Sequence, residues 1–121
     1  MAKKRINFEI DGKNVDVYFG LDFLDEIDKK FSPKEGGQSL GLGLQITLPT
    51  LLSGNVKMLA EYIYNGTVTE SPRPSFDAVK NYLEEVDDIE KVFDEVISLL
   101  GESNATVISY RDIEKKMKKA K

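Results

Sequence analysis

The side chains best equipped for chemistry are the carboxylates gathered between residues 84 and 95. Paired carboxylates can serve as a general acid and base, or they can ligate a hard cation. Their spacing lacks the alternating oxygen ligands and central glycine of an EF-hand loop. Charge runs of this kind usually coat a solvated helix face, so we interpret the cluster as surface. It consists of Glu84, Glu85, Asp87, Asp88, Glu90, Asp94 and Glu95.

Two residue types that carry much of protein chemistry are missing from the 121 residues, because the chain has no His and no Cys. Their absence excludes Ser–His and Cys–His nucleophiles, His-ligated metals, thiolate zinc sites and disulfides. A small carboxylate-dependent enzyme is the catalytic alternative that remains, and it would need convergent acids with raised pKa values in a pocket. We predict that the chain is not an enzyme and that it has no catalytic residue, metal site or cofactor.

Four glycines, Gly36, Gly37, Gly41 and Gly43, could suggest a phosphate-binding loop. The segment contains neither GxGxxG nor GxxxxGK[ST], so we interpret it as a flexible approach to the next element.

Charge is unevenly distributed along the chain. Residues 6–110 hold 8 basic and 19 acidic side chains, whereas the end of the chain reads KKMKKAK. The basic end could contact phosphates, but it has no interleaved aromatic residues for base stacking. Because the acidic body would repel phosphates, we interpret the end as a solubilising tail and do not expect nucleic acid as a partner.

A leucine-rich segment is the most informative part of the chain. It alternates like a strand and also fits a helical stripe, and Pro49 would interrupt either element. We favour a kinked helix that ends near Ser53-Gly54. Its apolar side chains form either core, which we favour, or a partly exposed surface that accepts a partner's helix. The candidate partner-binding residues are Leu40, Leu42, Leu44, Ile46, Leu48, Leu51 and Leu52.

The N-terminal pattern predicts a hairpin followed by a helix. Strands are expected over about 5–10 and 14–19, with Asp11-Gly12 as the turn. Helical spacing of apolar residues begins at Gly20 or Leu21 and ends at Ser32-Pro33. A lone hairpin is marginal in water, so we expect this helix to cover its apolar face.

Further elements are expected in the middle part of the chain. We expect a loop over residues 33–39, a helix that Asn55 caps and Asn65-Gly66 ends, and a surface linker over TVTESPRP. Ser75 is the expected cap of the next helix.

The last part of the chain is expected to be helical. The pair Asp87 and Glu90 resembles a capping box for a helix that ends at Gly101. The two helices on either side of Asp87 could also be one continuous helix. The weak stripe in residues 105–121 predicts a frayed helix or a mobile tail.

Length and pattern together predict one domain. We expect a mostly helical α+β fold in which an N-terminal β-hairpin packs on a bundle of about four to five helices. The globular domain is predicted to span 1–104, and 105–121 are predicted to be the basic tail. No apolar run approaches the roughly 20 residues that a membrane span needs, and the start MAKKRINF lacks the apolar stretch of a signal peptide.

The order of these segments resembles the tail assembly chaperones of long-tailed bacteriophages and prophages of low-GC Gram-positive bacteria. The resemblance covers about residues 5–101. It rests on INFEIDGKNVDVYFGLDFLDEIDKKF, GLGLQITLPTLLSGN, LAEYIYNGT, SPRPS and YLEEVDDIEKVFDEVISLL.

The resemblance implies a non-catalytic role. Such chaperones bind the tape measure protein, keep it soluble and help tail-tube subunits polymerise around it. They act in the host cell cytoplasm and are generally absent from the finished virion. A programmed frameshift near the end of the gene often makes a longer form that is thought to recruit tail-tube protein. The Lys-rich end is compatible with such a site, and self-association is a further expectation. The alternative is a structural minor tail component of the virion.

Overall fold

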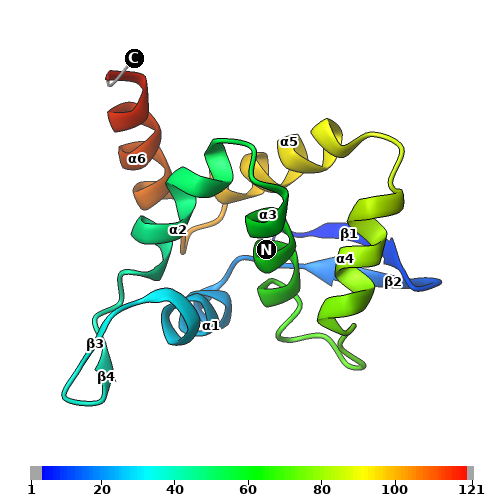
Figure 1. The fold of residues 1–121 in the computed structure, drawn as a ribbon, viewed down its shortest axis with the longest axis horizontal. Coiled ribbons are helices and arrows are strands. Elements are labelled where there is room, and N and C mark those ends of the chain that lie inside the picture. The colour runs from blue at the N-terminus through cyan, green and yellow to red at the C-terminus, as the bar shows by residue number, and fades with distance from the viewer. Residues whose placement is uncertain (1–3, 120–121) are drawn as a thin grey trace.

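Figure 1 shows the computed structural model, which describes residues 4–119, as two antiparallel hairpins and a set of helices. Within that range the fold is α+β and mostly helical, with an N-terminal hairpin, as the sequence predicts. The larger hairpin and helices α3 to α5 lie on one side of the molecule, and α2 and α6 lie on the other. The elements are β1 (Ile6–Ile10), β2 (Lys13–Val17), α1 (Leu21–Phe31), β3 (Lys34–Glu35), β4 (Gln38–Ser39), α2 (Gly43–Leu52), α3 (Val56–Asn65), α4 (Phe76–Glu85), α5 (Ile89–Leu100) and α6 (Val107–Lys119).

The first hairpin follows from alternation and from its turn. Phe8 pairs with Val15, and both side chains are buried. Asp11 and Gly12 have φ of 56° and 75°, which is the left-handed backbone that a type I′ turn requires at both central positions. The predicted strands and turn are confirmed to within a residue or two at their ends.

The apolar face of this hairpin packs against α4 and α5. Phe8 lies against Tyr82 of α4, with ring centroids 5.5 Å apart, and β1 contacts both α4 and α5. Helix α1 packs mainly against α2 and also contacts α3. The expectation that α1 covers the hairpin therefore does not match the structure.

Helix α3 ends against β2 at a glycine. Gly66 has an ordinary right-handed φ of −72°, so no positive φ explains its identity. A Cβ at this position would lie 2.5 Å from Cγ1 of Val17, which is too close for any side chain. The Tyr18 N–H donates to the Gly66 carbonyl at 2.9 Å. The predicted helix stop is confirmed, and a close approach of two elements is the reason for the glycine.

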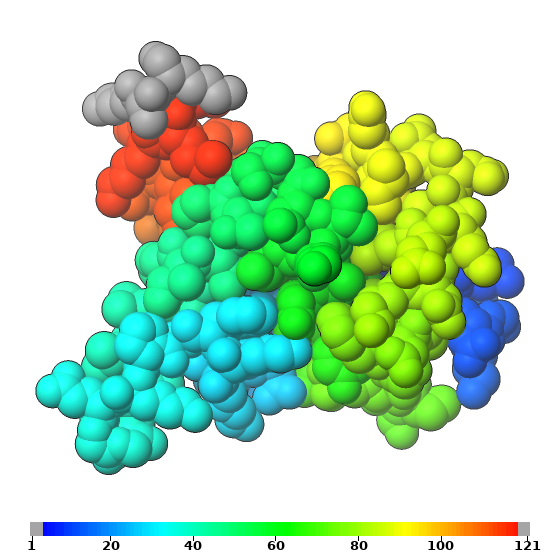
Figure 2. All heavy atoms as spheres, in the orientation of Figure 1, coloured from blue at the N-terminus to red at the C-terminus, as the bar shows by residue number. Residues whose placement is uncertain are grey.

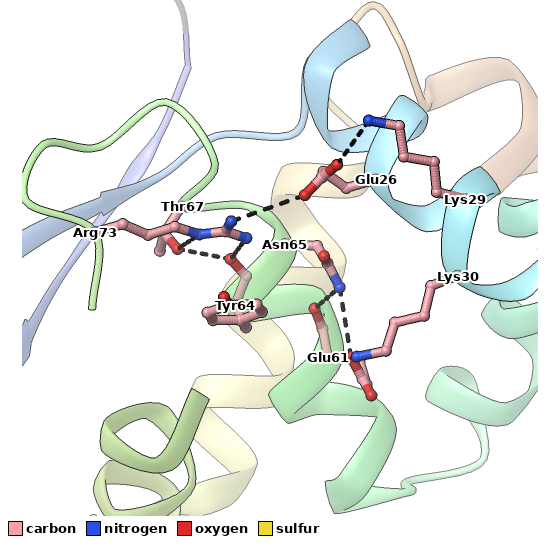
Figure 3. A network of polar contacts seen from close by, with 8 residues as sticks. All are labelled: Glu26, Lys29, Lys30, Glu61, Tyr64, Asn65, Thr67 and Arg73. Atoms are coloured by element: carbon pink, nitrogen blue, oxygen red, sulfur yellow. Dashed lines mark hydrogen bonds and ion pairs between the residues drawn. The ribbon is translucent and has the colours of Figure 1, made fainter. Parts of the chain in front are cut away.

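The segment after α3 is fastened by one arginine (Figure 3). The Arg73 guanidinium carbon lies 4.0 Å from the centroid of the Tyr64 ring. The same guanidinium donates to the Tyr64 carbonyl at 3.1 Å and to Oγ1 of Thr67 at 3.3 Å, and it pairs with Glu26 of α1 at 3.7 Å. This loop is therefore tied to two helices rather than being a simple linker.

Three expectations need correction. Residues 33–39 are not a plain loop, because Lys34 pairs with Ser39 around a turn in which Gly36 and Gly37 both have positive φ. Helices α4 and α5 are separate, so one continuous helix is wrong. The cap of α5 is Asp88, whose carboxylate accepts from the Lys91 N–H at 3.1 Å, and not Asp87. With Asp88 as the N-cap, the third helical residue is Lys91 rather than Glu or Gln, so the cap is a single side-chain bond and not the predicted capping box.

The other two caps agree with the sequence, and the last part of the chain forms a packed helix. Asn55 and Ser75 cap α3 and α4 through their side-chain oxygens. Residues 107–119 form helix α6, which packs against α2 and buries Ile113. The basic end continues to residues 120–121, which lie outside the described range. Within residues 4–119, no helix is long and apolar enough to cross a membrane.

We predict that Gly66→Ala lowers the free energy of unfolding by about 1–3 kcal/mol, because the added methyl group overpacks the contact with Val17. Gly101→Ala is the matched control. Gly101 also caps a helix with a right-handed φ, of −76°, but its nearest neighbour is the partly exposed ring of Tyr110. Urea denaturation followed by circular dichroism measures both variants. Equal losses at the two positions would contradict the close-approach explanation.

Candidate partner-binding surface

The leucine-rich segment forms the helix α2, and its apolar side chains divide between core and solvent. Leu44, Leu48 and Leu51 are buried, and Leu52 is half-buried. Leu40, Leu42 and Ile46 are 48%, 40% and 46% exposed. We call these last three residues the exposed α2 face. The segment is therefore partly core and partly exposed surface.

The start of α2 is held by the end of α1. The Asp28 carboxylate accepts from the Gly43 N–H at 2.9 Å, and Oγ of Ser32 accepts from the Leu42 N–H at 3.0 Å. A carboxylate at this position satisfies a free amide and also complements the positive end of the helix dipole. Helix α2 thus begins at a fixed point on α1.

Gly43 allows this contact. Its added Cβ would lie 2.6 Å from Cγ2 of Ile27 and 2.8 Å from Oδ1 of Asp28. The segment was expected to be a flexible approach, but Gly43 is buried where two helices nearly touch. The other glycines of this segment, Gly36, Gly37 and Gly41, have φ of 60°, 82° and 69° and therefore use the conformational freedom of glycine.

A buried hydrogen bond fixes the rotation of α2. Oγ1 of Thr47 donates to the Gly43 carbonyl at 2.9 Å, so the Tyr62 hydroxyl donates to Thr47, at 2.8 Å. The Tyr62 ring also packs edge-on against Phe23, with centroids 5.4 Å apart. Burial raises the pKa of the Tyr62 hydroxyl, which therefore stays protonated and remains a donor at physiological pH. Thr47 is thereby turned inward, and Ile46, about 100° away around the helix, is 46% exposed.

Helix α6 adds an apolar residue beside this face. Nε2 of Gln45 donates to Oγ of Ser109 at 3.3 Å, which brings the start of α6 next to α2. Ile108 precedes Ser109 and is 78% exposed. The sequence analysis did not select Ile108. The available signal was an apolar residue that lies off the stripe of Tyr110, Ile113 and Met117.

An apolar groove of about 620 Å³ lies between α3 and α4. No local sequence pattern predicts this groove, because its walls come from four separate elements, α1, α2, α3 and α4. Figure 2 views the face on which α2, α3 and α4 lie beside one another, in colours from blue-green to yellow-green. The apolar side chains that line the groove are Phe31, Val56, Met58, Ala60, Phe76 and Leu83.

The acidic residues between 84 and 95 are distributed over α4, the following turn and α5. Six of the seven are exposed, and Glu95 is half-buried. Among the residues that the structure describes, no group of three or more potential ligands could hold a metal ion. The cluster therefore has the surface character that its spacing predicts.

The comparisons with known proteins give one result. A family model described as "Phage tail assembly chaperone protein, TAC" matches residues 7–117. This match covers nearly the whole chain and extends through most of α6, beyond the part of the sequence that carries the resemblance. No curated protein and no solved structure matches the chain.

We predict that Asp28→Ala destabilises the protein by about 1–2 kcal/mol, because the first amides of α2 lose a charged cap. Asp28→Asn should lose less, since an amide oxygen can still accept from Gly43. Hydrogen exchange should accelerate first at residues 42–46. Asp25→Ala, at an exposed position three residues earlier on α1, is the control, and it should stay within about 0.5 kcal/mol. Exchange that rises uniformly along the chain would argue against a local anchor.

Proposed function

The chain belongs to the family of phage tail assembly chaperones, and from this membership we propose that it binds the tape measure protein. In this proposal it keeps that long helical protein soluble and helps tail-tube subunits polymerise around it in the host cytoplasm. It leaves before the virion is complete. A longer frameshifted form recruits tail-tube protein.

The exposed α2 face is the observation that carries this proposal. Three large apolar side chains face solvent there, Leu40 and Leu42 just before α2 and Ile46 on it. Asp28, Ser32 and Thr47 fix the position of this helix. A rigid apolar stripe can receive the apolar side of a partner helix. Contiguous exposed apolar surface on a folded protein commonly marks an interaction site. Leu44, Leu48, Leu51 and Leu52 support this surface from within.

Affinity at such a surface is modest for one copy. Burying apolar area contributes about 25 cal/mol per Å², and part of that gain is lost to ordering the partner. A tape measure protein with many apolar segments could bind many copies along its length. Linked binding events raise the overall affinity without new contacts. The acidic body, with 8 basic and 19 acidic residues over 6–110, would keep such a complex dispersed.

The first experiment is co-expression with the tape measure protein encoded in the same genome. We expect the tape measure protein to move into the soluble fraction and to co-elute with the chaperone. If it stays insoluble, repeating the experiment with the frameshifted form separates a missing domain from a wrong proposal. Failure with both forms contradicts the proposed function. Finding the chain in stoichiometric amounts in purified virions would instead favour a minor tail component.

Charged substitutions on the exposed α2 face separate binding from folding. We expect Leu42→Asp and Ile46→Asp to reduce co-purification of the tape measure protein severalfold. Stability should remain within about 0.5 kcal/mol of wild type, because Asp is favourable at a helix start. Leu21→Asp, at an apolar position that is 73% exposed on α1, is the matched control and should bind normally. Thermal unfolding of the two α2 variants at a much lower temperature would instead identify the face as core.

A further inference from the structure

Apolar side chains line the bottom of the groove between α3 and α4, which we call its floor. Charged side chains line its two sides, which we call its banks. Val56 at its rim is 46% exposed, and Phe31, Met58 and Leu83 lie in its walls. Tyr64 at the end of α3 packs on Phe76 at the start of α4, with centroids 5.4 Å apart. The two helices therefore run in opposite directions along the groove, and one end of it lies between the start of α3 and the end of α4.

Most polar groups around the groove already have partners. Oδ1 of Asn55 accepts from the Met58 N–H, and Oε1 of Glu61 accepts from Nζ of Lys30 at 2.6 Å. Nζ of Lys80 pairs with Asp77 at 3.3 Å and lies 5.1 Å from the centroid of the Phe76 ring. A small polar ligand would need unsatisfied polar groups that converge on the floor. The apolar side chains on the floor would instead pack against apolar side chains of a partner.

Two charged side chains on opposite sides of the groove, Lys57 and Glu84, are exposed. Lys57 on α3 and Glu84 on α4 both line the groove and are exposed, and in the part of the chain that the structure describes neither has an ion-pair partner. They sit on opposite banks near the same end, because Lys57 is at the start of α3 and Glu84 is at the end of α4. A charge of one sign on each side of an apolar seam matches a helix with the reverse arrangement.

We propose that this groove docks an amphipathic helix of the tape measure protein, as a site separate from the exposed α2 face. The apolar stripe of that helix fills the floor. A carboxylate on one flank faces Lys57, and an ammonium or guanidinium on the other flank faces Glu84. The two charges fix the direction in which the helix lies. This inference rests on the proposed function, since it names the partner's docking site and its chemistry.

Site-specific photo-cross-linking tests the site. A benzophenone amino acid replaces Val56, Ile46 or, as a control, Lys13 on β2, and each variant is co-expressed with the tape measure protein. We expect cross-links from positions 56 and 46 but not from 13, with the products at 56 mapping to apolar stripes that have opposite charges on their flanks. Cross-linking at 46 without 56 overturns the groove site and leaves the proposed function intact. Cross-links from 56 to a second copy of this chain also overturn it. If wild type fails to co-purify with the tape measure protein at all, both inferences fall.

Charge exchange tests the direction. Lys57→Glu combined with Glu84→Lys keeps the net charge but reverses the two banks. We expect this pair to lower co-purification further than either single change, by about tenfold relative to wild type if two ion pairs worth roughly 0.7 kcal/mol each are lost. Lys13→Glu combined with Glu35→Lys makes the same exchange on the two hairpins and should be neutral. Wild-type co-purification by the groove pair, with unchanged thermal unfolding, overturns the proposed chemistry.

Discussion

The arrangement around the exposed α2 face depends on the hydrogen bond between Thr47 and Tyr62. Hydropathy alone carries little information about which apolar side of α2 should face inward, because Ile46 lies away from the stripe of Leu44, Leu48 and Leu51 and is as apolar as they are. A buried hydroxyl supplies that information, since leaving it without a partner would cost about 1–3 kcal/mol. Tyr62 is itself held by Phe19 and Phe23. The aromatic core thereby determines which residues of α2 reach solvent.

Two glycines let neighbouring elements approach more closely than any side chain would permit. Gly43 lets α2 start directly against α1, and Gly66 lets α3 end directly against β2. At both positions the backbone also hydrogen-bonds across the contact, to Asp28 in the first case and to Tyr18 in the second. Close packing and satisfied amides are thus achieved together. Phe23 on α1 and its ring partner Tyr62 on α3 are positioned between these two points.

The sequence predicts local structure better than it predicts contacts between distant segments. The hairpin, the caps Asn55 and Ser75 and the helix ends near residues 32, 65 and 101 depend on a few neighbouring residues, and they are found as expected. The cover of the hairpin by α4 and α5, the clamp by Arg73 and the groove between α3 and α4 join segments that no local pattern links. The division of the leucine-rich segment falls between these cases. Helical spacing groups Leu44, Leu48 and Leu51 on one face, but the contact of Thr47 with Tyr62 and the packing of α2 on α1 join segments that are distant in the sequence.

The way in which α2 is anchored has a consequence for how such a protein can change its partner. The contacts that fix its start use main-chain amides, with Leu40 donating to the Pro33 carbonyl, Leu42 to Ser32 and Gly43 to Asp28. The outward side chains of Leu40 and Leu42 make no part of these bonds. If the proposed function holds, substitution at these positions can therefore follow a diverging partner sequence while the scaffold stays the same. The main-chain amides of Leu40 and Leu42 hold the fold, whereas their side chains would set what the surface binds. The side chains can therefore change without disturbing the fold.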